Sequence, residues 1–220
     1  MLESRFHQEL EQLKMTILRM AALTERALEK AFESYFSRNT EIAREIIEKD
    51  QEINLLEVEI DKYCLRLLAL DQPMAKDLRF IIGSMRIAVD LERIADQAVN
   101  IAERTIFMAA RPPLPPNPTL EQLADTALDM LKTVISAFVN GNTDQAYDVC
   151  QMDDTADELN AAVLKKQINY ILHEVPAVER SVQTIITARC IERAADQATN
   201  IAESVIFIVK GVNIKHHCET

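Results

Sequence analysis

Acidic and amide side chains recur at helical spacing in two stretches of this sequence. The first set is Glu92, Asp96, Asn100 and Glu103, and the second is Glu192, Asp196, Asn200 and Glu203. Steps of three or four residues place each set on one narrow stripe of a helix, within roughly 80° of arc. Acidic groups on successive turns repel each other by about 0.2 to 0.5 kcal/mol per pair, so each stripe needs a compensating charge. A metal ion that bridges the carboxylates is the simplest candidate for that charge.

The stretches that precede the two stripes carry polar residues at the same spacing. Asp153 and Asp157 precede the second stripe, and Asp50 and Asn54 precede the first. An antiparallel helical hairpin that turns near Pro73 or Pro176 brings residues of its two helices to equal heights. The residues paired in this way are Asp153 with Asp196, Asp157 with Glu192, Asp50 with Asp96, and Asn54 with Glu92. The sequence therefore predicts four oxygen-bearing side chains at matching heights in each half.

The first of these two predicted sites has one carboxylate fewer, because Asn54 stands where the second has Asp157. We expect weaker metal binding there, unless Glu57 supplies the missing charge. Oxygen ligands favour hard cations such as Mg²⁺, Ca²⁺, Mn²⁺ or ferric iron, whereas zinc is less expected without His or Cys ligands. Solvated helix faces are the alternative interpretation of such acids. Their repetition and matching heights favour metal binding.

Long helices with few connections are expected to position these side chains. The chain has only 3 glycines, and strand-rich folds need glycine turns at short intervals. We therefore predict an all-α fold with helices near 4–37, 40–70, 74–109, 120–139, 143–172 and 176–210. The signals that divide them are Asn39 as a cap, Pro73, the proline-rich run 111–118, Thr119 with Gln122 as a capping box, Gly141 with Asn142, Pro176 and Gly211.

The two halves of the chain form an internal repeat. Residues 91–107 and 191–207 are identical at twelve of seventeen positions. We predict two tandem, similar three-helix bundles at 1–110 and 119–212, with a proline-rich linker at 111–118 and a tail at 213–220. A further polar group in the third helix is expected to form an ordinary solvent face. It consists of Arg86, Asp90, Arg93, Gln97 and Arg104.

Charge and hydropathy exclude several classes of protein. A net charge of -11 repels nucleic-acid phosphates, so nucleic-acid binding is not expected. Basic residues show little clustering in the sequence, which argues against direct sensing of phosphate. The chain shows neither the pattern of a signal peptide nor an apolar run of the ~18 to 20 residues that cross a bilayer. Its four cysteines form no CxxC pair, which fits a reducing compartment. We expect a cytoplasmic protein that reaches a membrane only through its partners.

The sequence resembles the PhoU family, which is marked by the motif E(D)-x-x-x-D. This motif occurs as Glu92 to Asp96, Glu192 to Asp196 and Asp153 to Asp157, whereas a fourth copy that begins at Asp50 ends in Asn54. The resemblance also includes Pro-x-x-x-Asp-Leu-Arg at 73–79, and it spans essentially the full chain. It implies two similar three-helix bundles, with multinuclear iron or zinc clusters bound at the motifs.

The same resemblance implies a regulatory function and not an enzyme. PhoU-like proteins act with the ATPase of the phosphate ABC transporter and with the phosphate-sensing histidine kinase. They limit phosphate uptake and keep the phosphate-starvation genes off when phosphate is plentiful. A homodimer is expected from the long amphipathic helices.

Two alternatives stay open at the level of the sequence. One is a metal-free helical adaptor whose acidic stripes bind a basic partner. The other is a carboxylate-bridged di-metal oxidase in a helical bundle, which normally uses Glu-x-x-His ligands. No Glu-x-x-His occurs in the chain, and neither a GxSxG motif nor a phosphate-binding loop is present. Enzyme chemistry therefore has little support.

Overall fold

A computed structural model describes residues 2–212 as an all-helical protein, which confirms the predicted fold class. Its elements are α1 (Leu2–Ser37), α2 (Thr40–Asp71), α3 (Ala75–Ala109), α4 (Pro118–Asn140), α5 (Thr143–His173), the 3-10 turn η1 (Val175–Ala177) and α6 (Val178–Lys210). The tail predicted at 213–220, with Cys218, lies outside the described residues. None of the described helices is both long and apolar enough to cross a bilayer.

Most helix boundaries follow from capping residues that the sequence shows. The side chain of Asn39 accepts hydrogen bonds from the N–H groups of Glu41 and Ile42 at the start of α2. Asn142 caps α5 in the same way. Gly141 and Gly211 end α4 and α6 with φ values of 60° and 73°, a backbone region that glycine adopts without strain.

The start of α4 differs from the prediction. We expected Thr119 and Gln122 to form a capping box, but the helix begins at Pro118, and its cap residue Asn117 makes no side-chain capping hydrogen bond. Proline is suited to the first helical position, because the N–H that it lacks would have no partner within the helix and its φ is already fixed near the helical value. The helix therefore starts before Thr119, and this residue cannot act as its cap.

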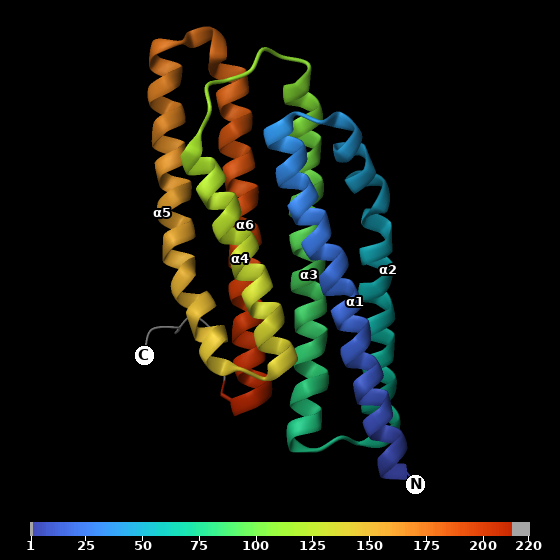
Figure 1. Ribbon diagram of the computed structural model, residues 1–220. Coiled ribbons are helices and arrows are strands. Elements are labelled where there is room, and N and C mark those ends of the chain that lie inside the picture. The colour runs from blue at the N-terminus through green and yellow to red at the C-terminus, as the bar shows by residue number, and fades with distance from the viewer. Residues whose placement is uncertain (1, 213–220) are drawn as a thin grey trace.

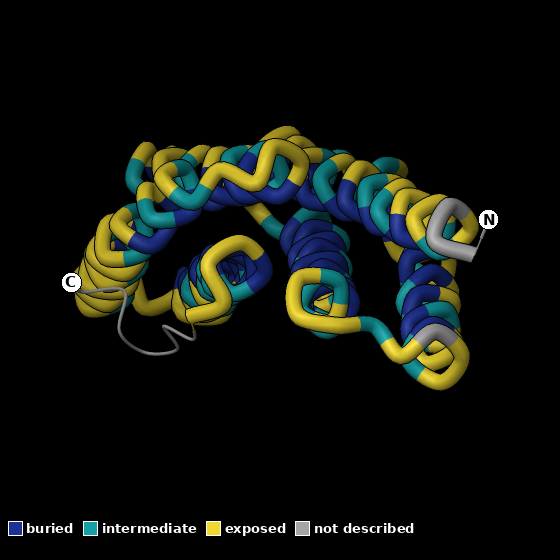
Figure 2. The backbone as a smooth tube through the Cα atoms, turned by 90° about the horizontal axis from the view of Figure 1, so that it is seen from below, coloured by how far each residue is buried: buried dark blue, intermediate teal, exposed yellow. Residues whose placement is uncertain are grey.

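The six helices form two triplets that share one core (Figure 1). Within each triplet every helix packs on the other two. At the centre, α3 and α6 run side by side in opposite directions, because Gly83 lies against Ile208 while Arg104 reaches Gln183. Figure 2 shows α1 and α4 across one side of this central pair, with α2 and α5 at the outer edges. The halves are thus packed together as well as joined by the linker.

The central packing changes the environment of the polar face predicted on the third helix. Asp90 is only 7% exposed, and buried polar atoms of Gln97 and Arg104 lie within the protein. Arg104 contacts Gln183 of α6 at 3.5 Å. The prediction that this whole face is an ordinary solvent face is wrong, because α6 covers part of it. The sequence pattern of one half alone does not show which of its polar faces the other half covers.

The proline-rich linker is held to the ends of the helices by three arginines. Arg38 donates hydrogen bonds to the carbonyl oxygens of Met108, Ala109 and Arg111. Arg111 pairs with Glu179 of α6 at 2.9 Å. Arg180 donates to the carbonyl oxygens of two linker prolines. These bonds join arginine side chains to carbonyl oxygens of the last turn of α3 and of the non-helical linker.

Candidate metal centres

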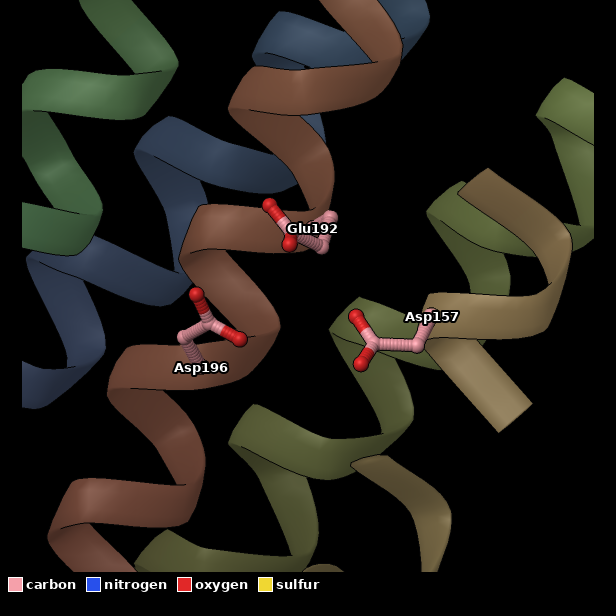
Figure 3. Close-up of side chains that lie close together, drawn as sticks. All are labelled: Asp157, Glu192 and Asp196. Atoms are coloured by element: carbon pink, nitrogen blue, oxygen red, sulfur yellow. The ribbon is translucent and has the colours of Figure 1, made fainter. Parts of the chain in front are cut away.

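Three carboxylates meet in the second half of the protein. Asp157 comes from α5, and Glu192 and Asp196 come from successive turns of α6. One oxygen atom from each lies within 4.8 Å of the others, and Figure 3 shows the three side chains gathered in the space between the two helices. The heights predicted from the hairpin turn near Pro176 therefore correspond to a real cluster. The rotation of the helices, which the sequence left open, also brings these side chains to face one another.

Glu192 is the most deeply placed of the three, at 5% exposure. Its Oε1 accepts a hydrogen bond from Arg189 at 2.8 Å. Its Oε2 is buried and has no hydrogen-bond partner. A buried carboxylate oxygen without a partner is costly, and a metal ion would supply what it lacks.

The electrostatics of this cluster indicate a shortage of positive charge. Burial, together with the charges of Asp153 and Asp157, raises the pKa of Asp196 to about 6. Burial and the charge of Asp196 raise the pKa of Glu192. Burial also raises the pKa of Asp153, although that side chain accepts a hydrogen bond from Thr199 at 3.2 Å. Without a cation, these carboxyl groups ionise at a higher pH than usual. A cation bound between them would lower their pKa values again.

The first half gathers a looser cluster from α2 and α3. Burial, followed by the charges of Asp96, Glu57 and Asp50, raises the pKa of Glu92, and burial together with the charge of Asp50 raises the pKa of Asp96. The pKa of Glu57 is likewise raised, mainly by burial. The amide of Asn54 donates to Asp50 at 2.8 Å, so it occupies an oxygen that a metal would use. Within the described part of this half, no three acidic groups come as close as those in the second half.

The residues at the far ends of the two stripes lie outside the cluster of three carboxylates. Glu103 is exposed and pairs with the neighbouring Arg104 at 3.0 Å. Asn200 and Glu203 line a groove between α3 and α6 together with Arg86 and Arg93. The structure does not place these residues among the three clustered carboxylates. Asn100 is half-buried on α3 and is not part of the cluster of three carboxylates.

Both clusters fit a cation by the chemistry of their donors. All the candidate ligand atoms are oxygens, which suits hard ions. Buried oxygens of Asp50, Asn54 and Glu192 lack partners. Sequence reasoning missed the residues that orient the acids, namely Arg189 beside Glu192 and Thr199 beside Asp153. Arg189 lies three residues before Glu192, a spacing that could have indicated the contact.

The raised pKa of Asp196 predicts a stability change in metal-free protein. The pKa of Asp196 in the folded state is about 6, above its usual value of 3.8. Its ionisation therefore costs stability as the pH rises from about 4 to 6, and the full cost is present above pH 6. With chelator present, Asp196→Asn should stabilise the protein by about 1 to 2 kcal/mol near pH 7.5, after allowance for partial exposure. The gain should fall to a small fraction of that value near pH 4, where the carboxyl is protonated in the folded state and only about half ionised in the unfolded state. Urea unfolding at the two pH values measures the difference.

The control for this experiment is Glu158→Gln, which removes an exposed acid of α5. We expect it to leave stability within about 0.5 kcal/mol of the original protein at both pH values. Equal stability of Asp196→Asn and the original protein near pH 7.5 would show that Asp196 carries no electrostatic cost.

Comparison with known proteins covers almost the whole chain. The family model described as PhoU domain matches residues 17–105 and 120–205, one copy in each half. The phosphate-specific transport system accessory protein PhoU homolog of Aquifex aeolicus is 38% identical over 212 residues, which cover 96% of both chains. The PhoU accessory protein of Escherichia coli is 28% identical, over 98% of this chain and 89% of its own.

Solved structures agree with the sequence comparison. The crystal structure of PhoU from Pseudomonas aeruginosa superposes with a TM-score of 0.92 at 33% identity, covering 94% of this chain and 100% of that one. The phosphate transport system regulatory protein PhoU from Streptococcus pneumoniae gives a TM-score of 0.88 at 30% identity, with 94% and 98% coverage. The similarity therefore includes both helical triplets and their arrangement.

Proposed function

Since the chain belongs to the PhoU family, we propose that it restrains phosphate uptake and keeps the phosphate-starvation genes off when phosphate is plentiful. Members of this family are accessory proteins of phosphate transport. The observation that carries the proposal is the match of the family to both halves of the chain, over nearly its full length. A partial match would support only a shared fold.

The protein acts through contacts with other proteins in the cytoplasm. Its partners are the ATPase of the phosphate transporter and the phosphate-sensing histidine kinase. Exposed apolar side chains at the turns of the two hairpins support such contacts. Met74 is 80% exposed at the α2–α3 turn, and Leu172 is 72% exposed at the α5–α6 turn. Apolar groups in such positions are suited to partner surfaces.

Metal ions occupy the two acidic clusters in this proposal. Asp157, Glu192 and Asp196 hold the metal of the second half, with Asp153 beside them, and Asp50, Glu92 and Asp96 hold that of the first. Iron or zinc follows from the family resemblance, and the oxygen ligands also suit magnesium, manganese or calcium. The bound ion neutralises the crowded carboxylates and ties α5 to α6, or α2 to α3. The clusters are thus braces that fix the helical surfaces offered to partners.

The metal-free adaptor is the second candidate. In that case the acidic clusters would bind a basic partner directly. The burial of Glu192 Oε2 favours metal, because an enclosed oxygen is better placed for a small ion than for the side chain of another protein. A homodimer remains a prediction, which light scattering of the purified protein tests.

We expect deletion of the gene to leave phosphate-starvation genes expressed in phosphate-rich medium. We also expect the transporter ATPase to copurify with the protein at native expression. Leu172→Glu combined with Val175→Glu should weaken that copurification, because it places charge on the exposed turn of the second hairpin. A reporter of a phosphate-regulated promoter and quantitative mass spectrometry of the purified complex provide the two measurements.

The matching control is Met15→Glu, which changes an exposed apolar residue on α1, away from both hairpin turns. It should copurify the ATPase as the original protein does. Unchanged gene expression after deletion, together with no transporter or kinase component in the complex, would refute the regulatory proposal.

A further inference from the structure

A cavity of about 150 Å³ lies among α1, α2 and α3. Its walls are mainly apolar and come from all three helices. They include Leu23, Ala27, Ile46, Ile53, Ala95 and Val99. A water molecule takes about 30 Å³, so the cavity has room for a ligand about as large as five water molecules.

Basic side chains line the same cavity. Lys30 and Lys49 both point their ammonium groups at Glu45, at 2.7 Å and 2.6 Å, and each takes a different oxygen of that carboxylate. Their hydrogen bonds hold the pKa of Glu45 at about 2. This position is therefore already built to hold a carboxylate, and the protein's own side chain occupies it.

Besides Lys30, Lys49 and Glu45, the cavity lining contains three further charged residues. Arg26 adds a third positive charge. Of the two other acids, Glu52 pairs with Arg19 at 2.8 Å, and Asp50 accepts a hydrogen bond from Asn54. Neither acid pairs with Lys30 or Lys49, which leaves both lysines to Glu45, although the second carboxylate oxygen of Asp50 is buried without a partner.

The second half of the protein shows that the fold does not require these basic residues. The equivalent caps Asn39 and Asn142 set an offset of 103 residues between α1–α2 and α4–α5. At this offset Arg26, Lys30 and Lys49 correspond to Asp129, Thr133 and Met152. A helical triplet of the same kind therefore forms without any of the three cations.

The apolar wall of the cavity also differs between the two halves, in the size of one side chain. Ala27 corresponds to Met130, which is fully buried. A methionine at this point takes up space that alanine leaves open. The first half thus combines a smaller side chain, which opens the cavity, with a pair of lysines beside it.

We propose that this cavity is a binding site for a small organic acid. The carboxylate of the ligand lies between Lys30 and Lys49 in place of Glu45, which turns outwards to solvent. The body of the ligand, about five carbon atoms long, packs against the apolar wall around Ala27. Asp50 lines the cavity as well, so the site adjoins the acidic cluster of the first half. The site needs no metal and is independent of the function proposed above.

Calorimetric titration of the full-length protein with hexanoate tests the proposal. We expect a dissociation constant on the order of 1 mM for a ligand of this size. Glu45→Gln removes the competing carboxylate and should tighten binding roughly tenfold, since two ion pairs no longer have to be exchanged. Lys30→Thr with Lys49→Met installs the residues of the second half and should abolish binding.

Two further variants separate the cavity from general surface charge. Ala27→Met keeps both lysines, fills the cavity with the side chain of the second half, and should abolish binding. Lys132→Thr removes a surface lysine outside the cavity lining and should bind as the original protein does. Circular dichroism of each variant verifies that it is folded.

The results that would overturn the proposal are equally specific. One is hexanoate binding that is unchanged in both Ala27→Met and the double lysine variant. Another is the absence of binding to both the original protein and Glu45→Gln at about 10 mM ligand, a concentration tenfold above the expected constant.

Discussion

A protein that carries both Glu192→Gln and Asp196→Asn should lose the metal of its second half. Each substitution keeps the shape of the side chain but removes the negative charge that a cation needs. Glu192 has a buried oxygen without a hydrogen-bond partner, and one oxygen each of Asp157, Glu192 and Asp196 lie within 4.8 Å of one another. Elemental analysis of protein purified without chelator or affinity tag gives the metal content per chain. The expected result is near-complete loss from this half.

The first half provides the matched comparison. Glu92→Gln with Asp96→Asn should remove a smaller amount of metal, because Asn54 gives that cluster one carboxylate fewer and bonds to Asp50. Conversely, Asn54→Asp should increase the metal content of the first half. Unchanged stoichiometry in the Glu192 and Asp196 double variant would rule out these residues as ligands. No metal in any of the proteins, even after reconstitution, would leave the metal-free adaptor.

The largest effect on folding is expected at Gly83, where α3 passes α6. A side chain at this position would overlap the Cγ1 and Cδ1 atoms of Ile208, with the backbone oxygen of Ser204 close behind. Gly83→Leu should therefore destabilise the protein by about 3 kcal/mol through overpacking. This loss exceeds the gain of about 1 kcal/mol that leucine brings to a helix interior over glycine. Urea unfolding in the presence of chelator measures the difference.

A second variant distinguishes the contact from a general helix effect. Ile208→Ala removes the two atoms that the new side chain would meet. Combined with Gly83→Ala, it should give a double mutant more stable than the sum of the single effects predicts, because one change relieves the clash caused by the other. Strict additivity, or a Gly83→Leu protein as stable as the original, would show that α3 and α6 do not pack closely at this point.

The helices were largely predictable because short-range chemistry sets their ends. Asn39, Asn142, Gly141 and Gly211 act at the positions where their side chains or backbone freedom are needed. The hairpin turn near Pro176 also placed the second cluster at the correct height. Pro118 was the exception, since it started α4 without the expected cap.

The remaining features depend on contacts between segments far apart in the sequence. Asp90 pairs with Arg93, yet it is buried on the side of α3 that borders α6. Glu103 shares a stripe with Glu92 on an ideal helix, yet it pairs with Arg104 rather than joining the cluster. The cavity beside Lys30 depends on how tightly three helices meet. Periodicity reports which residues share a face, but it does not report what that face meets.

The opposite directions of α3 and α6 give the protein the symmetry of a dimer within one chain. Two equivalent helices that pack antiparallel are related by an approximate twofold axis, and such a surface is complementary to itself. A chain of half this length would pair with its own copy through such a surface. Fusion removes the requirement that both copies be identical. It has allowed Asn54 to differ from Asp157 and Ala27 from Met130, a division of labour that a symmetric pair of identical subunits cannot encode.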